Sequence, residues 1–120
     1  MKINNKKTGN RGEELASEYL QKKGYRIEER NFRTRFGELD IICWDGEILV
    51  FVEVKTKIGH DFGEPEEMVN KGKLFQVKRM AELYLLQSTF KESPCRVDVV
   101  AIVLSSNGEV EKLEHYEAVY

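Results

Sequence analysis

The segments Gly37-Glu38-Leu39-Asp40-Ile41-Ile42 and Phe51-Val52-Glu53-Val54-Lys55 decide how this chain can fold. Both are rich in β-branched and large apolar residues, which is typical of buried strands. Charged residues interrupt them, although a buried charge is costly unless it is paired or binds a metal. The pattern Asp-x12-Glu-x-Lys inside two buried strands therefore predicts a functional site.

The turn between the two segments sets their expected geometry. Asp45-Gly46 is a strong signal for a two-residue hairpin turn, and with it positions whose numbers sum to 91 lie opposite each other. Glu38 then faces Glu53, and Asp40 is a diagonal neighbour of Glu53, roughly 7–8 Å away at Cα. We expect these three carboxylates and Lys55 on one face. The other face is expected to be apolar: Leu39, Ile41, Cys43, Ile48, Val50, Val52 and Val54.

Composition indicates one domain over residues 1–120, because 120 residues with 41% hydrophobic content can bury a sizeable core. Residues 1–8 are expected to be flexible. No apolar run approaches the ~18 residues of a membrane-spanning helix, and the polar start is not a signal peptide, so we expect a cytoplasmic protein without membrane contact. Cys43 and Cys95 are expected to be reduced core thiols, with a disulfide as the minority alternative.

The net charge of −2 argues against nucleic-acid binding, but the distribution of charge is uneven. Residues 1–60 hold 12 Lys and Arg against 10 Asp and Glu, whereas residues 81–120 hold 3 against 7. This asymmetry fits a phosphate-binding face, and a solvated surface could carry the same charges. Arg33 and Arg35 belong to the basic groups on which such a face would depend.

The pattern along the chain predicts an α/β fold. We expect helices over residues 11–23 and 71–87, with Asn10 capping the first, Glu13 completing a capping box and Gly24 ending it. Strands are expected over residues 25–32, 36–56 (the hairpin), 95–104 and 110–120, with a polar loop over 57–67. The order α-β-β-β-α-β-β predicts a mixed sheet of about five strands flanked by helices.

Each candidate residue also has a structural explanation. Asp40 and Glu53 could be satisfied carboxylates that pair with Lys55. Glu13 could serve only as the capping residue. The others have similar alternatives, namely Lys73 and Gln76 as a solvated helix face and Asp98 as a partner of Arg96 or an exposed residue at a strand start.

The combination of three carboxylates and a lysine favours a functional site. Mg²⁺ prefers a few carboxylate oxygens and leaves room for phosphate oxygens. A nearby lysine can stabilise developing charge or orient an attacking water. We find neither a Ser-His-Asp or Cys-His arrangement nor a phosphate-binding Gly-rich loop. The residues alone therefore favour a Mg²⁺-dependent phosphodiesterase or nuclease.

The spaced motifs resemble known families. Asp40…Glu53-Val54-Lys55 resembles the PD-(D/E)xK motif of restriction-endonuclease-like nucleases. The chain is also similar, over residues 9–104, to the bacterial YraN family of inferred endonucleases, which is related in fold to archaeal Holliday-junction resolvases. The blocks that carry this similarity are Gly12-Glu13-x-x-Ala16-x-x-Tyr19-Leu20, Gly24-Tyr25, Arg30-Asn31-x-Arg33, Phe36-Gly37-Glu38-x-Asp40, Phe51-Val52-Glu53-Val54-Lys55, and the helix with Lys73 and Leu83-Tyr84-Leu85.

The resemblance implies roles for these residues. Asp40, Glu53 and the Val54 carbonyl would bind Mg²⁺ or Mn²⁺, and Glu13 would complete the acidic cluster directly or through water. Lys55 would be the catalytic lysine. Lys73 and Gln76 would approach the scissile phosphate. One departure from the family is Lys57, where an arginine is common; it keeps the charge and loses a bidentate phosphate contact.

Two functions remain open at this point. The first is a metal-dependent endonuclease that acts on structured or branched DNA. A resolvase-like role would also predict a symmetric homodimer. The alternative is a non-catalytic DNA-binding or protein-interaction module on the same fold, in which the acids are structural.

Overall fold

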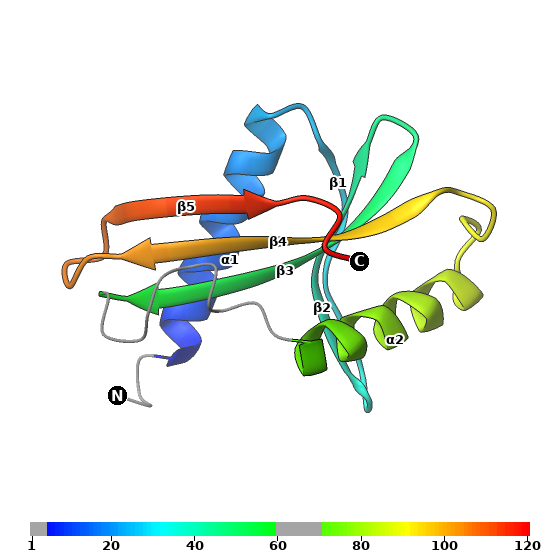
Figure 1. The fold of residues 1–120 in the computed structure, drawn as a ribbon, viewed down its shortest axis with the longest axis horizontal. Helices are drawn as coiled ribbons and strands as arrows, with labels where there is room; N and C mark the ends of the chain where they lie inside the picture. The colour runs from blue at the N-terminus through cyan, green and yellow to red at the C-terminus, as the bar shows by residue number, and fades with distance from the viewer. Residues whose placement is uncertain (1–4, 60–70) are drawn as a thin grey trace.

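The computed structural model describes residues 5–59 and 71–120, and these form two helices and five strands (Figure 1). Their order is α-β-β-β-α-β-β, as predicted. None of the described helices is long and apolar enough to cross a membrane. The elements are α1 (Asn5–Lys22), β1 (Arg26–Thr34), β2 (Gly37–Asp45), β3 (Ile48–Ile58), α2 (Lys71–Gln87), β4 (Cys95–Leu104) and β5 (Val110–Tyr116).

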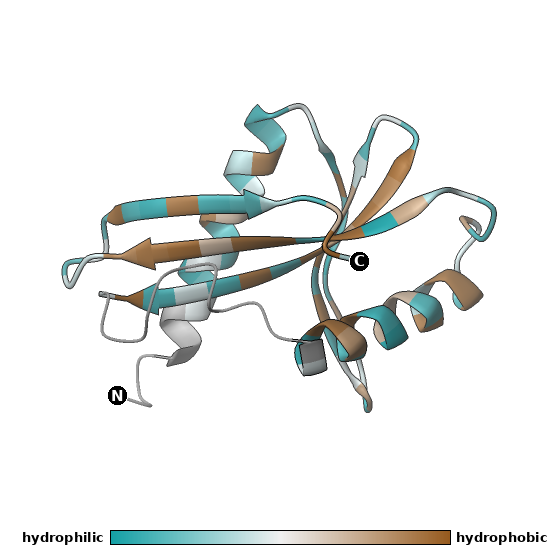
Figure 2. Ribbon diagram, in the orientation of Figure 1, coloured by the Kyte–Doolittle hydropathy of each residue, from teal (hydrophilic) through white to brown (hydrophobic). Residues whose placement is uncertain are grey.

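The strands form one mixed sheet in the order β1-β2-β3-β4-β5. Only β3 and β4 are parallel, because the crossover that contains α2 connects them, and the other neighbours are antiparallel. β1 lies at one edge of the sheet, where its charged residues remain accessible to solvent. Hydrophobic residues concentrate along β4, an interior strand, whereas hydrophilic residues dominate its neighbour β5 at the other edge (Figure 2).

The two helices cover opposite faces of the sheet. Ala16 and Leu20 of α1 pack with Val50 and Val52 of β3, whereas α2 packs against Phe51 and its neighbours. This division follows from the alternation of side chains along a buried strand. The buried residues of α2 are Val77, Met80, Ala81 and Tyr84, and Leu74 and Leu85 are partly buried beside them.

The start of α1 corrects the sequence interpretation. The helix begins at Asn5, so Asn10 lies inside it and the predicted capping box of Asn10 and Glu13 is wrong. The other end is as predicted, because Gly24 has a positive φ of 103° and Tyr25 N–H donates to the Leu20 carbonyl, a common helix stop. The expected flexibility of residues 1–8 stays a prediction.

The cysteines and the loop after β3 differ in part from expectation. Both cysteines are free thiols; Cys43 is buried, but Cys95 is exposed, so the prediction of two core thiols is wrong for the second. β3 runs to Ile58, two residues into the segment predicted as a loop. The rest of that segment, from residue 60 onward, lies outside the described residues.

The register of the β2–β3 hairpin is two residues away from the predicted one. Asp45 pairs with Ile48, so the turn consists of Gly46 and Glu47 rather than Asp45 and Gly46. The physical reason is that Gly46, with φ of 61°, occupies the first central position, where two-residue turns accept glycine. Because a shift of two conserves the side-chain alternation, most residues keep their predicted face.

Gly12 brings α1 unusually close to β3. A Cβ atom at this position would overlap the Thr56 side chain, including its Cβ at 2.9 Å. Gly9, three residues earlier in the same helix, has no atom within 4 Å of an equivalent Cβ. The close approach at Gly12 sets the distance of the neighbouring Glu13 from the sheet.

We expect Gly12→Ala to lower the free energy of unfolding by about 1–3 kcal/mol, because the helix must move away from β3. Gly9→Ala is the matched control, and it should stabilise the protein by roughly 0.5–1 kcal/mol through helix propensity alone. Urea denaturation of both variants measures the difference. Equal effects of the two substitutions would contradict the close approach.

Candidate active site

The sheet opens where β2 separates from β3. Pairing between these strands ends at Ile41 and Val52, although both strands continue past this pair. Beyond it, β2 stays with β1 and β3 stays with β4, so the two pairs of strands diverge (Figure 1). Asp40 and Glu53 are the first residues past the fork on their strands.

Asp40 and Glu53 form a buried pair of carboxyl groups at this fork. They are only 6% and 5% exposed, and their carboxyl groups are within hydrogen-bonding reach of each other. The fork releases the Val54 N–H from the β2 ladder, and this N–H donates to Asp40 Oδ2 at 2.8 Å. Glu53 Oε2 is buried and accepts no hydrogen bond from the residues that the structure describes.

The environment of Asp40 strongly favours its protonated form. Burial raises the pKa of Asp40, and the hydrogen bond and charge of Glu53 raise it further, against the lowering effect of the Val54 N–H. The raised pKa of about 9 keeps Asp40 protonated at neutral pH. A cation bound to both groups would replace this proton.

Lys73 reaches the carboxylate pair from the first turn of α2. Its Nζ lies 3.4 Å from Glu53 Oε2, and its side chain is 35% exposed. The cation beside Glu53 is thus Lys73, and not Lys55 as the structural alternative supposed. Lys55 is half-buried two residues after Glu53 on β3, so its side chain leaves the same side of the strand.

Glu13 lies on α1 near the fork and is held by other partners. It is half-buried and shares a side-chain hydrogen bond with Asn31, which adopts a positive φ of 55°. Burial and then the charge of Glu38 raise the pKa of Glu13, while nearby arginines oppose this. Its own charge contributes to the raised pKa of Asp40. Glu13 therefore influences the pair electrostatically.

Two carboxyl side chains, rather than three, are placed to bind a hard divalent cation. Within residues 5–59 and 71–120, no three His, Cys, Asp or Glu side chains gather closely enough to hold a metal. Asp40 and Glu53 supply two adjacent carboxyl groups, which Mg²⁺ accepts when water completes its coordination. The roles expected for the Val54 carbonyl and for Glu13 through water stay predictions.

Two parts of the predicted face are wrong in detail. Glu38 does not face Glu53. It lies opposite Arg33 of the neighbouring strand β1, and Arg33 Nε donates to Glu38 Oε2 at 2.7 Å. Leu39 packs in the cluster beneath α2 instead of sharing a face with Ile41. Both residues lie past the fork, where β2 stays paired with β1 but no longer pairs with β3, so the predicted alternation against β3 does not apply to them.

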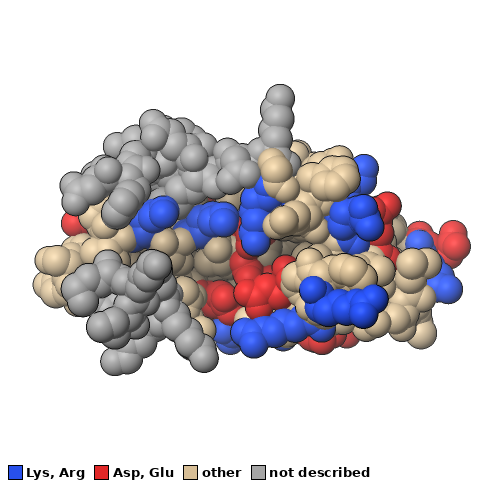
Figure 3. All heavy atoms as spheres, turned by 90° about the horizontal axis from the view of Figure 1, so that it is seen from below, with Lys and Arg blue, Asp and Glu red and all other residues tan. Residues whose placement is uncertain are grey.

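Basic side chains surround the acidic centre. The face seen from below shows Asp and Glu side chains at its middle, bordered by Lys and Arg (Figure 3). Arg33 is well exposed, the Arg35 guanidinium lies 5.0 Å from the centre of the Phe36 ring, and Gln76 is exposed on α2. Substrate binding by these residues and by Lys73 stays a prediction.

Asp98 belongs to a separate, closed network. It is fully buried and accepts hydrogen bonds from Arg96 Nε at 2.9 Å and from the Ala118 N–H at 2.9 Å, and it contacts His115 Nε2 at 2.8 Å. The alternative of an exposed Asp98 is therefore wrong, and its pairing with Arg96 is confirmed. Sequence reasoning missed His115, because no local pattern connects it to a residue 17 positions away.

We expect Asp40→Asn to raise the free energy of unfolding by about 1–2 kcal/mol in EDTA at neutral pH, because asparagine is neutral in both states and removes the cost of protonating Asp40 on folding. Since the folded pKa of Asp40 is raised from 3.8 to about 9, only the unfolded state ionises between these values, and the stability of the wild type should fall as pH rises through that range. The stability of the variant should not fall with pH in this way, and Mg²⁺ should stabilise only the wild type. Thermal melts across pH measure both effects.

Asp45→Asn is the matched control on the same strand. Asp45 pairs with Arg96 Nη1 at 3.1 Å, so its loss should destabilise the fold. A lower melting temperature for Asp40→Asn would mean that Asp40 is a structural hydrogen-bond acceptor, and would contradict the prediction.

The fold and the site together define an α/β protein whose mixed sheet opens around a buried carboxylate pair. The chain belongs to the uncharacterised protein family UPF0102, whose family model matches residues 12–102. The match includes Glu13, Asp40, Glu53, Lys55 and Lys73, and it confirms the similarity to YraN-like proteins.

The similarity extends over nearly the whole chain. A UPF0102 protein of Desulforamulus reducens is 44% identical over 117 residues, which is 96% of each chain. The UPF0102 protein of Thermodesulfovibrio yellowstonii is 47% identical over 109 residues, 91% of each chain. That of Syntrophomonas wolfei is 48% identical over 100 residues, 83% of this chain and 87% of the relative.

Proposed function

We propose that this protein is a Mg²⁺-dependent endonuclease that hydrolyses phosphodiester bonds in structured or branched DNA. The supporting observation is the buried pair of Asp40 and Glu53, with a Glu53 oxygen that accepts no hydrogen bond from the described residues. Two adjacent buried carboxylates destabilise a fold unless a cation compensates them. A bound Mg²⁺ would compensate both groups, and Mn²⁺ would fit the same oxygen ligands.

The residues around the pair have distinct proposed roles. Asp40 and Glu53 would hold the cation, together with the Val54 carbonyl. When bound, Mg²⁺ would supply a Lewis acid that lowers the pKa of water and neutralises phosphate charge. Lys55 would orient the attacking water and assist its deprotonation. Lys73 would stabilise the charge that develops on the phosphate.

Basic residues beside the site would bind the DNA backbone. Arg33 and Arg35 lie on β1 and in the turn that follows it, and Gln76 lies one turn after Lys73 on α2. Side chains from two elements on either side of the carboxylate pair can contact successive phosphates. For junction DNA we further propose a symmetric homodimer in the cytoplasm, since two strands must be cut; sedimentation velocity tests this.

The first experiment is cleavage of a mixed panel of single-stranded, duplex, flap and four-way-junction DNA. The wild type should cleave at least one branched substrate with Mg²⁺ or Mn²⁺, and both EDTA and Asp40→Ala should abolish that activity. Metal-dependent cleavage that persists in Asp40→Ala would contradict the proposed site, because one of its two ligands is then dispensable.

One observation favours a second candidate, a non-catalytic DNA-binding or protein-interaction module. Lys73 already lies 3.4 Å from Glu53 Oε2, so the acidic pair has a cation without any metal. In that case Asp40→Ala and Glu53→Ala would change stability or binding, and Mg²⁺ would affect neither. Absence of cleavage together with DNA binding that is insensitive to Mg²⁺ would favour this candidate.

A further inference from the structure

Phe36 is an aromatic side chain presented to solvent on a fixed turn. It lies in the two-residue turn between Thr34 and Gly37, and it is 67% exposed. The Thr34 hydroxyl accepts a hydrogen bond from Phe36 N–H at 3.0 Å and donates to Met80 Sδ at 3.4 Å. The turn is therefore anchored on α2, and the position of Phe36 is defined before any ligand binds.

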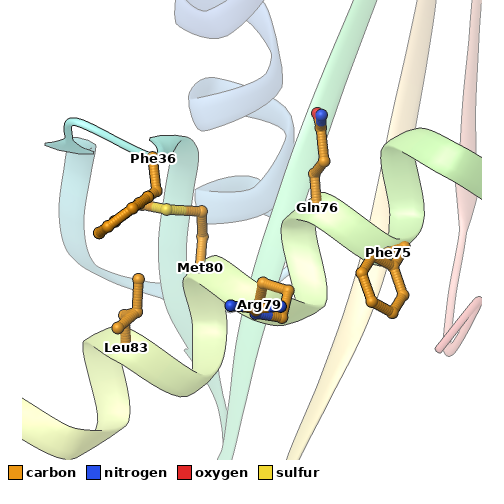
Figure 4. A pocket seen from close by; sticks show the side chains of 6 residues that line it. All are labelled: Phe36, Phe75, Gln76, Arg79, Met80 and Leu83. Atoms are coloured by element: carbon orange, nitrogen blue, oxygen red, sulfur yellow. The ribbon is translucent and has the colours of Figure 1, made fainter.

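Phe36 forms one wall of an apolar cavity of about 430 Å³ along α2 (Figure 4). Phe75, on the other side of the cavity, is 55% exposed. A cavity of this size is in the range of small-molecule sites, and two aromatic walls suit a planar ring. The remaining lining residues are Gln76, Arg79, Met80 and Leu83.

The apolar cavity adjoins the carboxylate site. A smaller hollow shares Phe36, Gln76 and Met80 with the cavity and is also lined by Lys73. Lys73 Nζ is in turn 3.4 Å from Glu53 Oε2. A group seated against Phe36 would therefore lie next to the position proposed for the reacting phosphate.

The charges at the rim indicate which ligand the cavity accepts. The Arg35 guanidinium lies 5.0 Å from the centre of the Phe36 ring, and Arg79 lines the cavity itself. Aromatic walls beside arginines are typical of sites where nucleobases stack and phosphates pair with cations. An apolar peptide would use the walls and leave these cations uncompensated.

We propose that this cavity binds an unpaired nucleobase of the DNA, which stacks on Phe36 while Arg35 and Arg79 bind the flanking phosphates. The inference rests on the proposed function and specifies its substrate class. DNA with an unpaired base next to the cleaved bond is bound in preference to continuous duplex. Gaps, flaps and junction arms provide such bases, whereas a base inside a duplex must first be unstacked.

The test measures base stacking and affinity separately from cleavage. A flap DNA and a matched duplex, each with one 2-aminopurine, are titrated with wild type, Phe36→Ala and Phe36→Trp in EDTA and again in Ca²⁺. Val110→Ala is the control, because Val110 is an exposed apolar residue on β5. Cleavage of the same DNA in Mg²⁺ is measured in parallel.

We expect Phe36→Ala to weaken flap binding roughly 10-fold, to leave duplex binding within about 2-fold, and to abolish the 2-aminopurine signal. Phe36→Trp and Val110→Ala should behave like the wild type. The inference would be overturned if Phe36→Ala bound flap DNA as tightly as the wild type, or if its affinity for duplex fell by the same factor. It would also be overturned if the protein bound no DNA in either buffer. So would a wild-type dimer that Phe36→Ala dissociates, because the cavity would then belong to a second copy.

The failure of this inference and that of the proposed function are distinguishable. Cleavage that depends on Asp40 and is unaffected by Phe36→Ala would leave the nuclease in place and remove the base pocket. Stacking that depends on Phe36 without any cleavage would support the pocket and remove the nuclease.

Discussion

Replacing Glu53 by glutamine should lower the rate of Mg²⁺-dependent DNA cleavage by roughly 1,000-fold or more, because it removes a proposed metal ligand at the centre of the site. Glutamine has nearly the same shape as glutamate, so packing at the fork should persist. DNA affinity should stay the same or rise, since one negative charge near the phosphate is lost. Single-turnover cleavage and anisotropy titrations measure the two quantities.

Glu47→Gln is the matched control for this prediction. Glu47 is exposed in the β2–β3 turn, at the opposite end of the hairpin from the fork, so its loss should leave cleavage unchanged. If Glu53→Gln retained most of its activity, the carboxylate pair would not be the catalytic centre. If it lost activity and DNA affinity in equal measure, Glu53 would act in binding alone.

The elements that sequence predicted well are those whose pattern is set locally. α2 and β4 begin and end at the predicted residues, because core spacing on a helix and an unbroken apolar run are both properties of one segment. The capping signal at Asn10 failed because helical residues continue N-terminal to it. A capping residue is recognised only by where the helix starts, and α1 starts five residues earlier, at Asn5.

The buried carboxyl pair of Asp40 and Glu53 was predictable in its members but not in its geometry. Asp40, Glu53 and Lys55 stand out because charges are unusual in buried strands. The predicted register was two residues off, and the fork between β2 and β3 has no signal in either strand, since it depends on how each strand pairs with its outer neighbour. The contact of Lys73 with Glu53 also depends on the placement of α2, which only tertiary structure defines.

Contacts between residues far apart in the sequence were the features that the sequence predicted least well. Phe36 looked like part of a strand, and its exposure follows from a turn that packs on Met80, a residue far along the chain. No local pattern singles out His115, yet it contacts the buried Asp98. In both cases the tertiary arrangement of the sheet and helices determines the contact, and the spacing of residues along the chain does not predict it.

Asp98→Ala should lower the free energy of unfolding by about 3–5 kcal/mol, because it leaves Arg96 and His115 without their shared carboxylate. The side chains of Arg96 and His115 are 13% and 3% exposed, so water does not replace the lost contacts. Asp98→Asn should cost less, since its amide oxygen can still accept the Ala118 N–H. Urea denaturation at neutral pH ranks the three proteins.

A surface ion pair provides the control for the loss of a carboxylate. Glu114 lies 3.9 Å from Lys112 Nζ, and both side chains are well exposed. Glu114→Ala should therefore change stability by less than about 1 kcal/mol. Similar losses for Glu114→Ala and Asp98→Ala would show that burial of the Asp98 network contributes little.

The dependence on pH separates the Asp98 charge from its packing. Burial alone would raise the pKa of Asp98, but hydrogen bonds from His115, Arg96 and the Ala118 N–H outweigh it and hold the pKa below 3.8. The stabilisation is thus fully present above pH 3.8 and is lost as pH falls through the lower folded pKa. Wild type and Asp98→Asn should differ most at neutral pH and converge in acid. A constant difference down to pH 2 would mean that the network depends on the shape of Asp98 rather than on its charge.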